Sequence, residues 1–296
     1  MSWLLLTICS SALLGLYDFL KKIAVQDNAV FPVLFGSIAT GGLTWLPFII
    51  WSTAHPESLP HESLQVTHLT ASHHGLLFSK SILVVASWIC GYLGLKELPL
   101  SIATPIRATS PIWTITLALL IFSERPTPRQ WLGVGIILVA FFFFSLAGRK
   151  EGIRFHRSKA VGLIIAATLL GACSSLFDKF LLQTIHLTPT EVQAWFSLYS
   201  IPAMLPALWW WKRRRDRTSF QFRWSIPTIG LTLLIADWLY FTAITDPDAL
   251  ISVIAPVRRA ATVVSFTLGI LLLREPFRAS KGLAVMGILV GVFLLA

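Results

Sequence analysis

Long apolar runs, interrupted by short polar or proline-containing turns, dominate the sequence. Each run is about as long as the roughly 20 residues that an α-helix needs to cross the hydrocarbon core of a bilayer. Runs such as Leu132–Leu146 and Leu283–Leu295 are apolar almost throughout, whereas strands of a membrane β-barrel are about ten residues long and alternate in polarity. The pattern predicts an all-α polytopic membrane protein with ten helices, at residues 3–20, 30–51, 75–95, 100–122, 130–147, 160–182, 189–211, 224–244, 249–272 and 279–296.

The composition supports this prediction and excludes two other classes of protein. Of the 296 residues, 55% are hydrophobic and only 13% are charged. A soluble domain carries about 25% charged residues, and a disordered chain contains fewer apolar residues than this one. Cys9, Cys90 and Cys173 lie in apolar runs without disulfide or metal spacing, so we expect them to be packing residues.

An internal repeat links the two halves of the chain. The segment Ser101–Arg107 in the fourth predicted helix matches Ser252–Arg258 in the ninth, with serine, proline and arginine at the same places. A glutamate follows each arginine by 17 residues, at Glu124 and Glu275. An aromatic-Asp element also recurs near the start of each half, in Tyr17-Asp18 and Phe177-Asp178.

The repeat predicts two five-helix domains, residues 1–148 and 159–296, joined by the basic linker 149–158. An odd number of helices per half forces the second half to enter the membrane the other way up, which makes the repeat inverted. Two inverted halves can rock about a site at their interface near the bilayer midplane. The sequence therefore predicts an alternating-access carrier, with a duplicated scaffold that transports nothing as the alternative.

Basic residues are distributed unevenly over the predicted loops. In the loops after even-numbered helices, the only basic residues are Arg125 and Arg129. By the positive-inside rule, the opposite loops are cytoplasmic and both termini lie outside. We therefore interpret the basic run 212–215, which follows the tryptophans 209–211, as a signal for membrane orientation. A binding site for lipid phosphate or nucleic acid is the alternative interpretation, and we expect no nucleic-acid partner. The 17 basic residues of the opposite loops are Lys21, Lys22, Lys96, Arg149, Lys150, Arg154, Arg157, Lys159, Lys212, Arg213, Arg214, Arg215, Arg217, Arg223, Arg274, Arg278 and Lys281.

Eight ionisable side chains fall at membrane depth. Each costs about 2.5 to 3.5 kcal/mol on insertion scales and therefore needs a partner or a wet cavity. Matching depth predicts an Asp18–Arg107 pair toward the cytoplasmic side and an Asp178–Arg258 pair toward the external side. These pairs are either gates of a transport pathway or permanent salt bridges that merely offset burial. The eight residues are Asp18, Lys80, Arg107, Asp178, Lys179, Asp237, Arg258 and Arg259.

The two arginines of the repeat each follow a proline by two residues. Pro105 and Pro256 cannot donate a backbone hydrogen bond to the carbonyls of Ser101 and Ser252, so we expect a kink at each proline. A kinked helix with loose carbonyls beside a cation can form a polar pocket in an apolar bundle. A kink that serves packing alone is the other interpretation.

Asp237 lies near the middle of the eighth predicted helix. It could exchange protons and couple transport to a proton gradient. Alternatively, Lys80, Lys179 or Arg259 neutralises it, and this pairing is favoured because several cations share its side of the membrane. Aromatic residues nearby could line a cavity for an organic substrate or serve only as packing residues; they are Trp88, Tyr92, Trp238 and Tyr240.

Two further groups of residues indicate metal binding or helix contacts only weakly. Five histidines fall in the polar loop after the second predicted helix, at positions 55, 61, 68, 73 and 74, but their spacing fits no tight ligand motif. We therefore expect a solvated loop with no metal site, and no cofactor. Gly133 and Gly135 in the fifth helix, and Gly287 and Gly291 in the tenth, permit close helix contacts. These contacts are either internal or part of a homodimer.

The sequence resembles the EamA family of the drug/metabolite transporter superfamily. The resemblance rests on the two five-helix repeats, their proline-arginine elements, and the passage from Glu124 through Gln130 to Gly133; the second half has a shorter passage, Glu275–Gly282, that lacks the glutamine. It implies a central cavity between helices 1, 3, 4, 6, 8 and 9, and commonly exported substrates such as amino acids, metabolites or drugs. It also implies cytoplasmic termini, contrary to the charge distribution.

The leading hypothesis is a carrier in the plasma or inner membrane that binds a small organic solute and membrane lipids and performs no covalent chemistry. A flippase for a lipid-linked sugar is one alternative, because the resemblance extends to relatives that handle such cargo. A membrane-embedded enzyme acting on lipids is another, although no zincin, nucleophile-elbow or phosphate-cradling motif occurs in the sequence.

Overall fold

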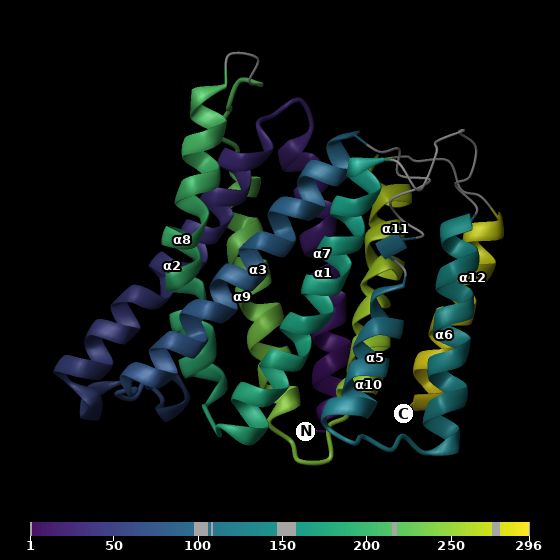
Figure 1. Cartoon of the computed structure of the whole chain (residues 1–296), viewed down its shortest axis with the longest axis horizontal. Coiled ribbons are helices and arrows are strands. Elements are labelled where there is room, and N and C mark those ends of the chain that lie inside the picture. Colours follow the sequence, from purple (N-terminus) through teal and green to yellow (C-terminus); the bar gives the residue numbers. More distant parts are fainter. Residues whose placement is uncertain are drawn as a thin grey trace.

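The structure, a computed structural model, describes residues 2–97, 106–107, 109–146, 158–214, 218–273 and 279–295. Within these ranges the chain is helical and forms no strand, which confirms the all-α prediction. The helices stand side by side across the molecule (Figure 1). Ser101, Pro105, Glu275 and most of the predicted linker lie outside the described residues.

Where the chain is described, each helix lies within or close to a predicted apolar run, and the order of the runs is kept. The first half contains α1 (Trp3–Val25), α2 (Val30–Ala54), α3 (Ala71–Glu97), α5 (Ser110–Ile121) and α6 (Pro128–Leu146). Two short 3₁₀ turns, Pro56–Ser58 and Glu62–Leu64, lie between α2 and α3. The second half contains α7 (Lys159–Lys179), a π-helical turn (Phe180–Thr184), α8 (Pro189–Arg213), α9 (Ser225–Ile244), α10 (Ile251–Arg259), α11 (Ala261–Leu273) and α12 (Ala279–Leu295).

Several helices have the length and composition of membrane spans. Six are long and apolar enough to cross a bilayer: Trp3–Val25, Val30–Ala54, Ala71–Gly91, Lys159–Thr184, Ser225–Ile244 and Ile251–Leu272. Two shorter apolar helices cover Ser110–Ile121 and Val285–Leu294. Large side chains such as Leu120, Phe143 and Phe293 are exposed, as expected where helices face lipid. The chain is an integral membrane protein.

Side-chain caps help to fix where the helices begin. The Ser2 hydroxyl accepts a hydrogen bond from the third residue of α1, and the Ser158 hydroxyl does the same for α7. At the start of α8, Thr188 and Glu191 form a reciprocal capping box. These contacts satisfy N–H groups that have no partner within the helix.

The two ends of the molecule differ in charge. Both labelled chain termini lie at one end in Figure 1, together with the connection between α5 and α6 that carries Arg125. The other end receives the last turns of α1 and α8, with Lys21 and Arg213. We call this second end the basic end.

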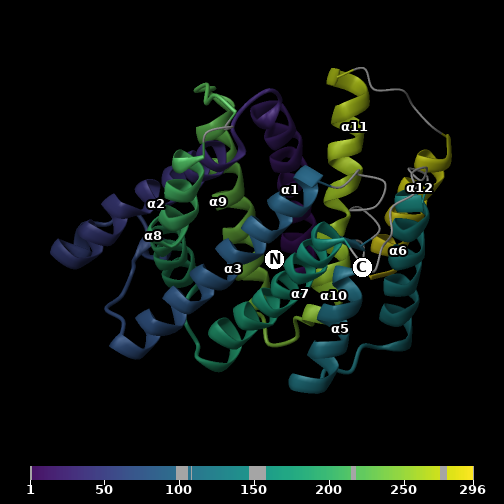
Figure 2. The same ribbon diagram turned by 45° about the horizontal axis from the view of Figure 1, so that its top comes forward.

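The packing of the helices repeats between the halves. α1 packs on α9 and on α11, and α7 packs on α3 and on α5, while α2 pairs with α8 and α6 with α12. Because Ser252–Arg258 of α10 matches Ser101–Arg107, the counterpart of α5 is α11. Replacing α1 by α7, α2 by α8, α3 by α9, α5 by α11 and α6 by α12 leaves this set of pairs unchanged. Figure 2 shows the same neighbours from a second direction.

Hydroxyl groups bridge several of these helix pairs. Ser10 of α1 donates to the carbonyl of Ala236 in α9 at 2.7 Å, and Ser87 of α3 donates to the carbonyl of Ala167 in α7 at 2.9 Å. Between membrane helices such hydrogen bonds contribute to association together with the packing of small residues. They hold together the helix pairs that surround the cavities described below.

The ninth predicted helix is interrupted, although not at its proline. Pro256 lies inside α10, which ends at Arg259, and α11 begins at Ala261. Around the break the N–H of Ala260 bonds to the carbonyl of Val257 at 2.9 Å, a tighter turn than an α-helix makes. The interruption therefore lies one turn after Pro256, and the kink at the proline itself stays a prediction. Glu124 binds the start of α10, as described below.

Glycines bring α6 and α12 close together. A Cβ on Gly287 would lie 2.8 Å from the Cβ of Ala140, and a Cβ on Gly291 would lie 2.5 Å from Ile137 Cγ1 and 2.9 Å from the carbonyl oxygen of Gly133. The close approach that these glycines permit is thus made within the chain. Homodimer formation through the same two helices remains a prediction.

Replacing Gly291 by alanine should lower the melting temperature of the purified protein, because overpacking of this kind costs about 1–3 kcal/mol. Gly135→Ala is the matched control, since a Cβ there meets nothing within 4 Å and alanine favours the helix. Thermal unfolding in detergent measures both. Equal melting temperatures for the two variants would contradict the close contact between α6 and α12.

Candidate functional site

Three adjoining cavities run through the helix bundle. The first, about 170 Å³, shares Ser87, Trp88 and Gly171 with the second, about 210 Å³. A small third cavity, about 30 Å³, shares Trp88, Phe196 and Asp237 with the second. Because they share walls, the cavities form one tract between α1, α2, α3, α5, α7, α8, α9 and α10.

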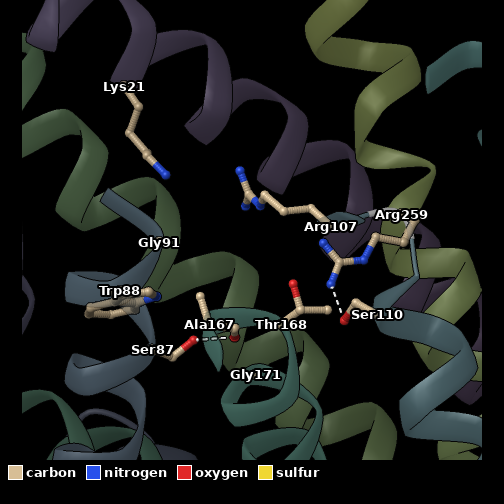
Figure 3. A pocket seen from close by; sticks show the side chains of 10 residues that line it. All are labelled: Lys21, Ser87, Trp88, Gly91, Arg107, Ser110, Ala167, Thr168, Gly171 and Arg259. Atoms are coloured by element: carbon tan, nitrogen blue, oxygen red, sulfur yellow. Dashed lines mark hydrogen bonds between the residues drawn. The ribbon is translucent and has the colours of Figure 1, made fainter. Parts of the chain in front are cut away.

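The first cavity, which we call the cationic cavity, is lined by three basic side chains from different parts of the chain. Lys21 comes from α1, Arg107 from the segment before α5, and Arg259 from the end of α10 (Figure 3). Arg259 Nη2 donates to the hydroxyl of Ser110 at 2.7 Å. No carboxylate is among the described lining residues, of which the others are Ser87, Trp88, Gly91, Ala167, Thr168 and Gly171.

Asp18 does not form the predicted pair with Arg107. Its carboxylate lies 3.7 Å from Lys21 Nζ on the same helix, and its side chain is about half exposed. Residues three apart share a helix face, so Lys21 reaches Asp18 more readily than Arg107 does from another element. Of the two predicted partners, only Arg107 lines the cationic cavity.

The second cavity, which we call the paired cavity, contains two ion pairs. Lys80 binds Asp178, both fully buried, and Arg258 Nη2 lies 2.8 Å from Asp237 Oδ1. The predicted Asp178–Arg258 pair is therefore wrong. Tyr240 connects the two ion pairs, because its hydroxyl donates to Asp178 at 3.3 Å and its ring centroid lies 3.7 Å from the Arg258 guanidinium carbon. Four buried charges and one phenol form a single cluster.

These ion pairs compensate charges that the bundle would otherwise bury alone. A buried charge without a partner is strongly destabilising. Asp237 is paired, as favoured from the sequence, but with Arg258 and not with any of the three cations considered there. Lys80 also lies 4.2 Å from the ring centroid of Phe196, which adds a cation–π contact.

A second buried cluster centres on Glu124, in the connection between α5 and α6. Its carboxylate accepts hydrogen bonds from the N–H groups of Ile251 and Ser252 at 2.8 and 2.9 Å, and from the Ser252 hydroxyl. Lys179 Nζ lies 2.6 Å from the same carboxylate. A negative charge at a helix N-terminus is favourable, because unpaired N–H groups and the helix dipole face it. Glu124 therefore joins α10 and α7 to the first half of the chain.

The cavity tract is closed at the end where Glu124 lies. Large apolar side chains pack beside the paired cavity there, and Leu77, Leu181, Phe241 and Ile254 are at most 1% exposed. On the other side of the tract, Arg107 of the cationic cavity is exposed. Within the described residues, the tract therefore ends in packed apolar side chains near Glu124 and in an exposed arginine at the cationic cavity.

The predicted aromatic lining is only partly present. Trp88 lines all three cavities and Tyr240 lines the paired cavity. Trp238 instead packs in an apolar cluster with Trp45 between α2, α8 and α9. The side chain of Tyr92 lies outside the described residues.

The histidine-rich loop shows no clustered ligands. His55, His61 and His68 are exposed, and His74 accepts or donates a 2.9 Å hydrogen bond with the hydroxyl of Tyr199. In the part of the chain that the structure describes, no three His, Cys, Asp or Glu residues are grouped as metal ligands.

Sequence reasoning missed the roles of several cavity residues. Lys21 was counted only as a loop charge, although it follows Asp18 by three residues and so shares its helix face. The sequence pattern marks Glu124 as part of the repeat and of the family passage, but it does not indicate which groups Glu124 binds. No pattern in the sequence marks Ser110 or Thr168, which reach the cavity through tertiary packing alone.

Comparison with known proteins identifies the family. The model of the EamA-like transporter family matches residues 1–146 and 158–296. The chain belongs to the EamA-like transporter family. Solute carrier family 35 member E4 from Homo sapiens is 31% identical over 97 residues, which cover 33% of this chain and 26% of that protein. One crystal structure has a TM-score of 0.72 at 15% identity and covers 99% of both chains, so the two share a fold.

Membership of the EamA-like family confirms the resemblance read from the sequence motifs. The matched family is a family of transporters, and the human relative is a solute carrier. The polar cavity tract inside an apolar bundle agrees with transport as the family's activity.

Replacing Lys80 by methionine should strongly destabilise the protein, because Asp178 then lies buried without a cationic partner; such losses amount to about 3–5 kcal/mol. The double variant Lys80→Met/Asp178→Leu should recover much of the lost stability, since no unpaired charge remains. Thermal unfolding of both variants tests this coupling.

Asp18→Asn serves as the control, because an exposed pair such as Asp18–Lys21 is screened by solvent and contributes little. Additive effects of the two substitutions in the double variant would contradict a direct pairing of Lys80 with Asp178.

Proposed function

We propose that this protein is a carrier that moves a small organic solute across the membrane by alternating access. The observation that supports the proposal is the polar cavity tract, which ends in an exposed arginine on one side and in ion pairs and packed apolar side chains on the other. Ionisable groups inside a membrane bundle mark substrate pathways. A pathway open on one side only is what a carrier requires in each of its two states.

The carrier is built from two inverted five-helix repeats that cross the membrane ten times. The repeats are residues 1–148 and 159–296, and residues 149–158 connect them. The helix pairing supports this architecture, because exchanging the two halves leaves the pairs unchanged. The separate match of the family model to each half supports it as well. Inverted repeats of this kind provide two states of similar energy that open to opposite sides.

The basic end faces the cytoplasm, and the structure then represents the state that is open to the cytoplasm. Lys21, Arg213 and Arg223 lie near the ends of helices that meet there, and the positive-inside rule places such residues in the cytoplasm. Both termini accordingly lie outside. Solute enters the tract from the cytoplasm and is exported across the plasma or inner membrane.

Glu124 acts as part of the external gate. It belongs to the first half, whereas its partners Lys179, Ile251 and Ser252 belong to the second. Opening the tract to the outside requires these contacts between the halves to break. Arg107 and Lys21 lie at the inner mouth, and the ion pairs of the paired cavity lie between the two gates.

Transport itself is tested with the purified protein in proteoliposomes. Amino acids, nucleosides and amphipathic cations are first screened for a rise in melting temperature, because a ligand that binds only the folded protein stabilises it. We expect at least one stabilising solute to cross proteoliposome membranes faster than empty liposomes allow. Solutes that bind but never cross would contradict a carrier.

Glu124→Gln should slow the flux of a transported solute about tenfold, which corresponds to about 1.4 kcal/mol. The substitution removes the charge that binds Lys179 and the strong acceptor at the start of α10. Glu62→Gln, in the exposed turn between α2 and α3, is the matched control and should leave flux unchanged. Equal flux in both variants would contradict the assignment of Glu124 to the gate.

Side-specific labelling tests the direction in which the tract opens. In a variant without Cys9, Cys90 and Cys173, Ser87→Cys places a thiol on the cavity wall, and Ser252→Cys places one in the closed region, where Ser252 is 1% exposed. A membrane-impermeant maleimide should label the Ser87 variant in inside-out vesicles and react little with the Ser252 variant. Preferential labelling of the Ser87 variant in right-side-out vesicles would contradict the proposed orientation and indicate the opposite one.

A further inference from the structure

We propose that the cationic cavity binds an oxyanion group of the transported solute, a carboxylate or a phosphate, so that the substrate is an organic anion. This inference rests on the proposed carrier function and names its substrate class. It arises from the charges that line the cavity: Lys21, Arg107 and Arg259 converge on one space from three elements (Figure 3). Their convergence gives a ligand more than one cationic contact.

The two arginines have positive charge that nearby carboxylates do not neutralise. In the described part of the chain, neither Arg107 nor Arg259 lies within ion-pair distance of a carboxylate, although every cation of the paired cavity does. The charges that act most strongly on Arg259 are those of Arg107 and Arg258, both positive, opposed by Asp18. Asp18 itself pairs with Lys21 at 3.7 Å. An anion that enters the cavity supplies the missing compensation.

Guanidinium groups favour oxyanions over other anions. A planar guanidinium presents a fork of N–H donors that matches the two oxygens of a carboxylate or two oxygens of a phosphate. Arg259 donates one N–H to the Ser110 hydroxyl at 2.7 Å, and this hydrogen bond orients its guanidinium toward the cavity wall. The other N–H groups of the guanidinium are further donors for a ligand. Two arginines without carboxylate partners match an oxyanion that carries one or two negative charges.

The adjoining paired cavity fits the remainder of such a solute. Its own charges are compensated, since Lys80 binds Asp178 and Arg258 binds Asp237. Trp88 stands on the shared wall and presents an aromatic surface. The charged group of the solute therefore occupies the cationic cavity, and its organic part extends into the paired cavity.

Binding is measured on the full-length protein in detergent with probes that share one skeleton. Succinate, succinamate and succinamide carry two, one and no negative charges, and glycerol 3-phosphate is compared with glycerol to separate phosphate from carboxylate recognition. We expect an anionic probe to bind at least about tenfold more tightly than its neutral counterpart. We also expect this preference to weaken as salt is raised.

Substitutions connect the binding to the two arginines. Arg107→Gln and Arg259→Gln should each weaken binding of the preferred anion about tenfold or more, while Arg259→Lys, which keeps the charge but not the fork, should retain part of it. Arg213→Gln is the matched control, because Arg213 lies at the same end of the molecule but stacks on Trp209 outside the cavities. It should bind like the wild type.

A lipid headgroup offers the same phosphate chemistry as a soluble anion. The measurement is therefore repeated in nanodiscs of phosphatidylcholine with and without phosphatidylglycerol. Displacement of the soluble probe by phosphatidylglycerol would contradict the proposal that the ligand is a soluble anion. Unchanged binding of the probe would support that proposal.

Three results would overturn the inference: neutral probes that bind as tightly as anionic ones, glutamine variants that bind like the wild type, or no anionic probe binding at about 10 mM. The carrier function is tested separately. Transport of neutral or cationic solutes without anion binding would support the carrier function and contradict the anion site. Anion binding without transport of any solute would support the anion site and contradict the carrier function.

Discussion

The carboxylate of Glu124 receives two backbone N–H groups and a hydroxyl from the start of α10 while it binds Lys179 of α7. One side chain thereby satisfies the unpaired donors of a helix terminus and compensates a buried cation, two demands that an apolar bundle cannot meet with water. Glu124 lies in the first half of the chain and its partners in the second. Several of the polar contacts between the two halves at this end of the bundle are therefore made by this one carboxylate.

Charge compensation also explains how one tract can contain two chemically different cavities. In the paired cavity, Lys80, Asp178, Asp237 and Arg258 neutralise one another around Tyr240, so the cluster is stable without any ligand. In the cationic cavity the basic groups outnumber the acids close to them. The first arrangement leaves the paired cavity with compensated charges, and the second leaves the cationic cavity with an excess of positive charge.

The all-helical class of the fold and the approximate positions of its helices were predictable from the sequence, because long apolar runs indicate both. The ion pairs were not. Asp178 and Arg258 both line the paired cavity, but spacing does not tell which side of its helix a residue occupies, and Arg258 binds Asp237. Asp18 likewise meets Lys21 on its own helix. Glu124 was visible as a repeated residue, yet its role depends on α10 beginning directly opposite it, which only tertiary packing decides.

The break after α10 has a geometric consequence for the whole tract. Arg258 and Arg259 are neighbours in sequence, yet one lines the paired cavity and the other the cationic cavity. Successive residues of a helix point about 100° apart, so a twist of α10 about its own axis swings both guanidinium groups together. The position of a basic side chain in each of the two cavities therefore depends on the orientation of one helix, α10.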